Sequence, residues 1–298
     1  MNYKKIFKNQ KLRFFLLRML SWVPASLMLK MQYWIKFDRT LNLKNPERFT
    51  EKLQHYKIYY RNSEMFNCVD KYLVREFLMS RNCEQYLNEL YGVYEKADDI
   101  DFMNLPNRFV IKTTDGGGGE NILICRDKMT LDIPITIKTV NSWRNKNVST
   151  MTHEWAYKGA KSSLIIVERY LEDPENKDLS IDDYKFFCFD GKVEYLVVDV
   201  DRYSGHKRNF YTKNWTLLDV SSDCPKADRK VPQPDSFVEM INVAEKLSSG
   251  FPFVRVDLYN IKNKVLFGEM TFYPWSGYVQ FNPDIFDFEL GNYFKINY

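Results

Sequence analysis

Two short segments near the C-terminus, 254–259 and 267–271, contain the residues best suited to bind a metal ion. Both alternate apolar and polar residues as a β-strand does, and alternate strand residues point to the same side. Paired as a hairpin, the segments would present four polar side chains on one face: Arg255, Asp257, Glu269 and Thr271. Two carboxylates and a hydroxyl are hard oxygen ligands suited to Mg²⁺, which commonly bridges to the phosphates of ATP. The pattern therefore predicts a magnesium site formed by Asp257, Glu269 and Thr271.

That shared face depends on how the two strands are paired. We expect Tyr259 to lie opposite Val265 across a five-residue loop, which places Arg255 opposite Glu269. A shift of one residue would send the charges to both faces, because side chains alternate along a strand. The alternative is an ordinary cross-strand ion pair between Arg255 and Glu269, with Asp257 in solvent.

A run of four glycines connects two further predicted strands, 109–112 and 122–125; the run consists of Gly116, Gly117, Gly118 and Gly119. Glycine has no side chain, so the backbone N–H groups of such a loop can wrap phosphate oxygens closely. Lys112 precedes the loop on its supporting strand and would add a fixed positive charge. The loop is not a P-loop, because the G-x-x-x-x-G-K-[ST] pattern is absent. The alternative to a phosphate-binding loop is a flexible hairpin turn.

Three stretches in the middle of the chain could complete a nucleotide and substrate site. A strand predicted at 164–170 ends in charges, so Glu168 and nearby backbone amides either meet the edge of an adenine or simply reach solvent. Asp183 and Lys185 alternate with apolar residues, which puts both on one face of the next strand. A basic cluster follows at Arg202, His206, Lys207 and Arg208. It is either solvated surface or a cradle for an anionic substrate such as a uronic acid or a lipid-linked diphosphate.

The elements that must position these residues are helices and antiparallel strands. A helix is predicted from Asn62 or Ser63 past residue 77, and another from the capping box Ser236-Phe-Val-Glu239 to Gly250. Segments 184–189 and 193–199 are predicted to form a hairpin that turns at residues 190 and 191. The expected fold class is therefore α+β.

The composition excludes several classes of protein. The 298-residue chain has a formal net charge of only +4 and no recognisable nucleic-acid-binding module, so we expect no nucleic-acid partner. Its five cysteines are widely spaced and form no C-x-x-C pair, which indicates reduced thiols of a cytoplasmic protein. With only three histidines, a histidine-rich metal centre is not expected.

The first 34 residues combine basic and apolar side chains. Three charged residues, Arg13, Arg18 and Lys30, interrupt the apolar run 12–34, so no transmembrane helix is expected. A signal peptide is not expected either, because the segment lacks a small-residue cleavage site. A helix broken or kinked at Pro24 could dock its apolar face on the body of the protein. It could instead lie on the anionic inner face of the cell membrane as a basic amphipathic anchor.

In their order along the chain, these motifs resemble the ATP-grasp superfamily. The motifs are Asp70-Lys71-x-x-x-Arg75, Lys112 with the glycine loop, Val167-Glu-Arg-x-Leu171, Arg255-x-Asp257 and Glu269-x-Thr271-x-x-Pro274. Three further stretches, 45–53, 183–189 and 251–259, look like the teichuronopeptide-biosynthesis (TupA-like) branch. This likeness runs from about residue 42 to about residue 283.

The resemblance implies an ATP-grasp fold, in which two α+β lobes with mostly antiparallel sheets clasp ATP. The expected parts are a basic amphipathic N-terminal helical segment (1–41), a helical part (42–108), a small lobe with the glycine-rich loop (109–167) and a C-terminal lobe with the metal site (168–298).

The resemblance also implies which residues bind ATP. They are Arg75, Lys112, the glycines 116–119, Glu168, Arg169, Leu171 and Asp183. Lys112 would contact the α-phosphate, Arg75 stands where many relatives have lysine, and Asp183 would bind the ribose. Adenine would meet Glu168 and the residues that follow it.

Catalysis would fall to the residues of the C-terminal lobe. Lys185 would help to hold the phosphates, and Arg255 would stabilise an acyl phosphate and the oxyanion that follows it. Asp257 and Glu269 would bind Mg²⁺, whereas Thr271 stands where the superfamily usually has a metal-binding asparagine. One metal or two are both compatible with that change.

ATP-grasp enzymes activate a carboxylate as an acyl phosphate, which an amine or another nucleophile then attacks. The implied activity is an ADP-forming ligase of surface or capsular polysaccharide biosynthesis, acting on a uronic acid or amino acid carboxylate and an amine donor. Arg202, His206 and Arg208 would hold the substrate. The alternatives are a kinase or phosphotransferase with the same nucleotide site, or a glycosyltransferase, for which Asp199-Val-Asp201 matches the D-x-D letters.

Overall fold

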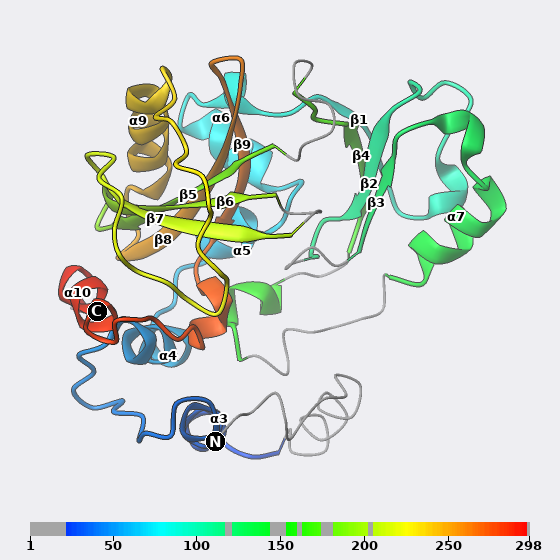
Figure 1. Cartoon of the computed structure of the whole chain (residues 1–298). Helices are drawn as coiled ribbons and strands as arrows, with labels where there is room; N and C mark the ends of the chain where they lie inside the picture. Colours follow the sequence, from blue (N-terminus) through cyan, green and yellow to red (C-terminus); the bar gives the residue numbers. More distant parts are fainter. Residues whose placement is uncertain are drawn as a thin grey trace.

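Two antiparallel β-sheets organise the part of the chain that the computed structural model describes: residues 22–116, 121–143, 153–159, 163–173, 181–201 and 205–296. The strands are β1 (Leu90–Tyr94), β2 (Phe109–Thr113), β3 (Ile122–Cys125), β4 (Ile165–Arg169), β5 (Asp183–Phe189), β6 (Lys192–Val200), β7 (Lys207–Thr212), β8 (Phe253–Ile261) and β9 (Lys264–Thr271). The α-helices are α3 (Ala25–Phe37), α4 (Phe49–Tyr59), α5 (Glu64–Val69), α6 (Val74–Ser80), α7 (Ile133–Asn141), α9 (Phe237–Ser248) and α10 (Ile285–Tyr293). Short 3-10 helices include η4 (Trp155–Gly159) and η5 (Pro274–Gly277). Figure 1 shows the two sheets in separate lobes that lie side by side.

The larger lobe is built on a five-stranded sheet in the order β7-β6-β5-β8-β9. Helix α9 covers one face of this sheet, where Phe186 packs against Phe237. The opposite face is apolar at one end, and there Phe49 of α4 packs against Phe253 with ring centroids 5.0 Å apart. The other end of the same face carries charged side chains, because alternate residues of β5 and β8 are polar. The sheet therefore combines a packed half and a polar half on one face.

The smaller lobe has a four-stranded sheet in the order β1-β4-β2-β3, and its strands also pair antiparallel. Alternate residues of β2, Phe109 and Ile111, form its core with Val167 of β4 and Val140 of α7. Strand β1 lies in the segment 42–108, which was predicted to be helical. The small lobe therefore begins before residue 109.

The helix predicted from residue 62 or 63 past residue 77 is interrupted. The structure has two shorter helices, α5 and α6, and the backbone of Asp70 between them is extended. The Asp70 carboxylate accepts hydrogen bonds from the backbone N–H groups of Tyr72 and Leu73, at 2.8 and 2.9 Å. A short acidic side chain can satisfy N–H groups that have no partner within a helix, and so it favours a break at this point.

The predicted capping box before α9 is not formed, although the helix itself begins at Phe237 as expected. Ser236 makes no side-chain cap, and its Oγ lies 3.0 Å from Oδ1 of Asn260. Glu239 instead accepts a hydrogen bond from the hydroxyl of Tyr86 at 3.0 Å. Contacts with other elements have displaced the local capping pattern.

Helix α3 is the described part of the N-terminal segment, and it is fixed to the body of the larger lobe. Pro24 precedes its first residue. The hydroxyl of Tyr33 lies 2.8 Å from that of Thr50 in α4, and Thr50 donates to Asp287 of α10 at 2.7 Å. Residues 1–21 lie outside the described residues. Within the described part of the chain, no helix is long and apolar enough to cross a membrane.

Candidate active site

The polar ends of strands β8 and β9 meet in the hairpin that was predicted, but with a different register. Arg255 faces Thr271 and Asp257 faces Glu269, whereas the five-residue loop would have placed Arg255 opposite Glu269. The loop contains only two residues, between Ile261 and Lys264. All four polar residues nevertheless share one face, as expected.

A bulge at Gly268 restores this shared face. The two-residue turn alone would pair Asp257 with Gly268 and send Glu269 to the apolar side. The pairing shifts by one residue between Asp257 and Leu258, so that Gly268 is left out of the ladder. A Cβ atom at Gly268 would lie only 3.0 Å from the carbonyl oxygen of Asp257, so glycine permits this close approach without a shift of the neighbouring backbone. Turn and bulge together therefore set the geometry of the site.

The guanidinium of Arg255 lies at the centre of the predicted metal ligands. Its Nη2 donates to Oδ2 of Asp257 at 2.6 Å, to Oε1 of Glu269 at 3.3 Å and to Oγ1 of Thr271 at 3.2 Å. Burial works against the charged guanidinium, but contact with Asp257 raises the pKa of Arg255 above its ordinary value. Arg255 is therefore a permanently charged group in this site.

The predicted ligands fit a magnesium ion in chemistry and in placement. Two carboxylates and a hydroxyl converge on one point, where they surround the positive Nη2 of Arg255. Hard oxygen ligands of this kind are those that Mg²⁺ prefers. Among the described residues, no group of three or more His, Cys, Asp or Glu side chains is arranged to hold a metal ion. Asp257, Glu269 and Thr271 would hold the ion together with oxygens from another source, such as ATP phosphates.

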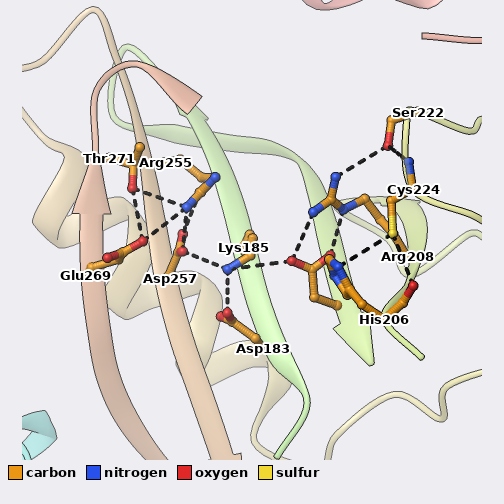
Figure 2. A network of polar contacts seen from close by, with 11 residues as sticks. Asp183, Lys185, His206, Arg208, Ser222, Cys224, Arg255, Asp257, Glu269 and Thr271 are labelled. Carbon is orange, nitrogen blue, oxygen red and sulfur yellow. Dashed lines mark hydrogen bonds and ion pairs between the residues drawn. The ribbon is translucent and has the colours of Figure 1, made fainter. Parts of the chain in front are cut away.

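Lys185 extends the charged network along the same face of the sheet (Figure 2). Its Nζ hydrogen-bonds the carboxylate of Asp183, donates to Asp257 at 2.9 Å and lies 3.8 Å from Asp199. Burial opposes the charged amine, but Asp183 and Asp257 outweigh it and raise the pKa of Lys185. Burial also raises the pKa of Asp257 to about 6, although Arg255 and Lys185 work in the opposite direction. Lys185 is thus a buried cation shared by three carboxylates.

The predicted substrate residues Arg208 and His206 lie at the far end of this network, while Arg202 lies outside the described residues (Figure 2). The guanidinium of Arg208 donates two hydrogen bonds to the carboxylate of Asp199, of 2.6 and 3.1 Å. Burial alone would raise the pKa of Asp199, but Arg208 and Lys185 hold it well below its usual range. Nε2 of His206 also approaches Asp199, at 3.1 Å. Asp199 therefore belongs to an antiparallel sheet and an ion-pair network, which does not suit the D-x-D motif of a glycosyltransferase.

The loop that follows β9 borders the site. Trp275 and Ser276 both adopt left-handed backbone angles, with φ of 52° and 53°. The buried amine of Lys57 holds this turn by donating to the carbonyl and hydroxyl oxygens of Ser276, both at 2.8 Å. The ring of Trp275 lies 4.9 Å from the guanidinium carbon of Arg208 and 6.0 Å from that of Arg255. An aromatic ring thus connects the two arginines at opposite ends of the network.

The small lobe contributes Lys112 and Glu168, which form an ion pair of 2.6 Å on neighbouring strands. Arg169 ends β4, and its backbone N–H and carbonyl bond Glu89 and Asn88, at 3.0 and 2.9 Å. The side chain of Leu171, just beyond, is half-buried. Gly116 is described at the start of the glycine loop, whereas Gly117, Gly118 and Gly119 lie outside the described residues.

Lys71, rather than Arg75, reaches the glycine loop. The Nζ of Lys71 hydrogen-bonds the carbonyl oxygen of Gly116, and its backbone N–H donates to Thr114 at 2.9 Å. Burial lowers the pKa of Lys71, and the carboxylate of Glu269 opposes this change. The amine of Lys71 therefore interacts with Gly116 of the small lobe and with Glu269 of the larger lobe. Arg75 donates to the carbonyl oxygen of Asn88 at 3.0 Å instead. The motif Asp70-Lys71-x-x-x-Arg75 therefore brings its lysine to the glycine loop, while ATP binding by Arg75 stays a prediction.

Tyr157 of η4 was not among the predicted site residues, yet Glu269 and Arg255 both influence its pKa. Burial raises the pKa of its phenol well above the ordinary value, and Glu154 and Glu269 add to this effect while Arg255 opposes it. Tyr157 therefore lies within electrostatic reach of the Arg255 cluster. No local pattern in the sequence around Tyr157 indicates this position.

Comparison with known proteins yields one family match. The family described as TupA-like ATPgrasp matches residues 51–295. No curated protein matches the chain.

Several solved structures are similar to this chain. The D-alanine–D-alanine ligase of Bacillus anthracis is 17% identical, with a TM-score of 0.41 over 69% of this chain and 57% of that one. The D-alanine–D-alanine ligase of Helicobacter pylori is 15% identical, with a TM-score of 0.42 over 76% and 61%. The L-amino acid ligase of Bacillus licheniformis is 12% identical, with a TM-score of 0.47 over 85% and 55%. The chain thus spans less than two thirds of these structures. At TM-scores below 0.5, this similarity supports no conclusion about the reaction or the substrate of the chain.

Proposed function

The chain belongs to the TupA-like ATP-grasp family, and from this premise we propose that it is an ADP-forming ligase that joins a carboxylate to an amine. The observation that supports the proposal best is the convergence of Asp257, Glu269 and Thr271 on Arg255, beside the buried Lys185. Two cations with raised pKa and a cluster of hard oxygen ligands suit a transferred phosphoryl group better than a neutral substrate.

Fixed charges would carry the chemistry on the protein side. Arg255 and Lys185 would stabilise the negative charge of an acyl phosphate and of the tetrahedral oxyanion that forms when the amine attacks. Buried ion pairs with Asp257 hold both side chains on this face of the sheet. Mg²⁺ held by Asp257, Glu269 and Thr271 would neutralise phosphate charge.

ATP would lie between the charged face of the larger sheet and the glycine loop of the small lobe. Lys112 on β2 and Lys71 at Gly116 supply positive charge on the small-lobe side. Glu168, Arg169 and Leu171 would border the adenine, and Asp183 would meet the ribose. The three glycines after Gly116 would wrap phosphate oxygens with backbone N–H groups.

The carboxylate substrate would be a uronic acid or an amino acid of surface polysaccharide biosynthesis, as the resemblance of segments 45–53, 183–189 and 251–259 to the teichuronopeptide-biosynthesis branch implies. Arg208 and His206 lie at the end of the network away from Glu269 and would bind this carboxylate. The partner substrate would be an amine, and the nucleotide product ADP.

A coupled assay for ADP release tests this proposal. The full chain is incubated with Mg-ATP, a panel of uronic acids and amino acids, and a panel of amines, and products are identified by mass spectrometry. We expect ADP release that requires both a carboxylate and an amine, with an amide as the second product. A phosphorylated product that is stable and forms without any amine would show a kinase instead.

Variants of the charged face provide a second test. Asp257→Asn and Glu269→Gln should each lower the rate of ADP release by about 100-fold or more, because each removes an oxygen ligand of the metal. Asp219→Asn is the matched control, because Asp219 is a fully exposed carboxylate whose ion-pair partner is Lys226. Full activity of both site variants would contradict the proposed metal site.

A further inference from the structure

Helix α3 has two apolar faces, and only one of them packs on the protein. Its buried residues are Met28, Leu29, Tyr33 and Phe37. The hydrogen-bonded chain from Tyr33 through Thr50 to Asp287 fixes this face to α4 and α10. The helix is therefore a rigid part of the larger lobe.

The opposite face is apolar but exposed. Leu27, Met31 and Trp34 are 58%, 40% and 54% exposed, and Trp22, just before the helix, is 79% exposed. Residues spaced by four and then three positions lie on the same side of a helix, so Leu27, Met31 and Trp34 form one stripe. We call these four residues the outer stripe. Contiguous exposed apolar residues of this size mark a surface that contacts another apolar phase.

The charge of the surrounding sequence indicates what that phase is. Residues 1–37 contain eight lysines and arginines and no aspartate or glutamate. The whole chain has 43 basic and 39 acidic residues, so the remainder after residue 37 is net acidic. Positive charge is thus concentrated in the part of the sequence that contains the outer stripe. Lys30 lies within the stripe's own helix and is itself exposed.

We propose that the outer stripe of α3 docks on the surface of an anionic phospholipid bilayer, with the helix parallel to the membrane plane. Tryptophan prefers the interface between lipid and water, and Trp22 and Trp34 flank Leu27 and Met31 on this surface. Exposed lysine side chains can place their amines among anionic headgroups while their stems contact acyl chains. Because the inner face of α3 is fixed to the larger lobe, docking would hold the active site in one orientation to the membrane.

This proposal reconciles the two expectations for the N-terminal segment. Docking on the protein and docking on a membrane are not alternatives for α3, because they use opposite faces of one helix. A protein partner would be a weaker fit, since lysine is depleted in protein–protein interfaces, whereas basic residues beside an apolar stripe are typical of interfacial helices.

Vesicle flotation of the full chain tests the proposal. Vesicles contain either phosphatidylcholine alone or phosphatidylcholine with phosphatidylglycerol, and binding is compared at low and high salt. We expect binding to the anionic vesicles at low salt, and a loss of most of it on neutral vesicles. Replacing Leu27 and Trp34 together by serine should lower the partition coefficient by about tenfold or more, because both side chains leave the lipid.

The matched control replaces Met103 and Met129 by serine. These residues are more exposed than the outer stripe but belong to the small lobe, so the control should bind vesicles like the unmodified protein. Circular dichroism and ADP release verify that each variant is folded. The proposal is overturned if the unmodified chain does not bind anionic vesicles, or if the Leu27/Trp34 variant binds as well as the control. Light scattering that shows a dimer lost in the same variant, without vesicle binding, would assign the stripe to a second copy of this chain.

Discussion

Replacement of Lys185 by methionine tests whether the charged face is held together as the structure indicates. Methionine has a similar length and volume but no charge, so the change removes one cation from among Asp183, Asp257 and Asp199. Lys185 and these three carboxylates are buried. Breaking a buried ion pair by removing one partner typically costs about 3–5 kcal/mol, because the remaining charge stays uncompensated. We expect a loss of that order in the free energy of unfolding at pH 7.

The loss should depend on pH in a defined direction. The pKa of Asp257 in the folded protein is already raised to about 6 by burial, and Lys185 is one of the two cations that oppose this rise. Without Lys185 the pKa rises further. A carboxylate whose folded pKa lies above its unfolded value of about 3.9 stabilises the fold when protonated, and this contribution is lost as pH rises through the folded pKa. The destabilisation by Lys185→Met should therefore be smaller at pH 5 than at pH 7, by about 1 kcal/mol or more.

Urea denaturation of the unmodified protein and the variant at pH 5 and pH 7 measures both quantities. Lys213→Met is the matched control, because Lys213 forms an exposed ion pair with Glu194 at 3.0 Å, and such pairs contribute only about 0–1 kcal/mol. In an Asp257→Asn background the cost of Lys185→Met should shrink. Equal stability of Lys185→Met and the unmodified protein at pH 7, or a larger loss at pH 5, would refute this account of the network.

Three further predictions concern the supports of the site and of α3. Gly268→Ala places a Cβ atom 3.0 Å from a backbone oxygen, so it should lower the free energy of unfolding by about 1–3 kcal/mol in urea denaturation and also slow ADP release. Burial lowers the pKa of Lys57 to about 8, below its unfolded value. The free energy of unfolding of the unmodified protein should therefore rise by about 1–2 kcal/mol, relative to that of Lys57→Met, between pH 7 and pH 9.5. An unchanged difference between the two proteins would contradict the burial of this amine. Tyr33→Phe removes the hydroxyl that lies 2.8 Å from Thr50 and should cost about 1 kcal/mol, whereas Tyr59→Phe, at an exposed position, should cost almost nothing.

The strand pattern around the site could be predicted from sequence because it depends on alternation alone. Arg255 and Asp257 alternate with valines, and one face of β8 had to be polar whatever its partner. The offset between β8 and β9 could not be predicted in the same way, since it depends on the loop length and on the bulge at Gly268. The four polar residues still share one face because the expected and observed pairings of β8 with β9 differ by two residues near the site, which is the period of side-chain alternation along a strand.

The place of β1 in the small lobe and the break in the helix at Asp70 were not predicted, for a different reason. Residues 62–77 have apolar residues at helical spacing, but spacing carries no information about a side chain that captures two backbone N–H groups. The same break places Lys71 at the glycine loop, where the hydrogen bond to Gly116 joins segments 45 residues apart. Long-range contacts of this kind leave no local pattern.

The hairpin of β8 and β9 shares an arrangement with the hairpin of β5 and β6. Each turns through two residues, and each shifts its pairing by one residue before the charged positions, between Phe187 and Cys188 in the first and between Asp257 and Leu258 in the second. Without its bulge, either hairpin would turn Asp199 or Glu269 toward the apolar side of the sheet. Turn length and bulge therefore act as a pair: a hairpin with one more residue in its turn would need no bulge, whereas a change in only one of the two would turn a carboxylate away from the charged face.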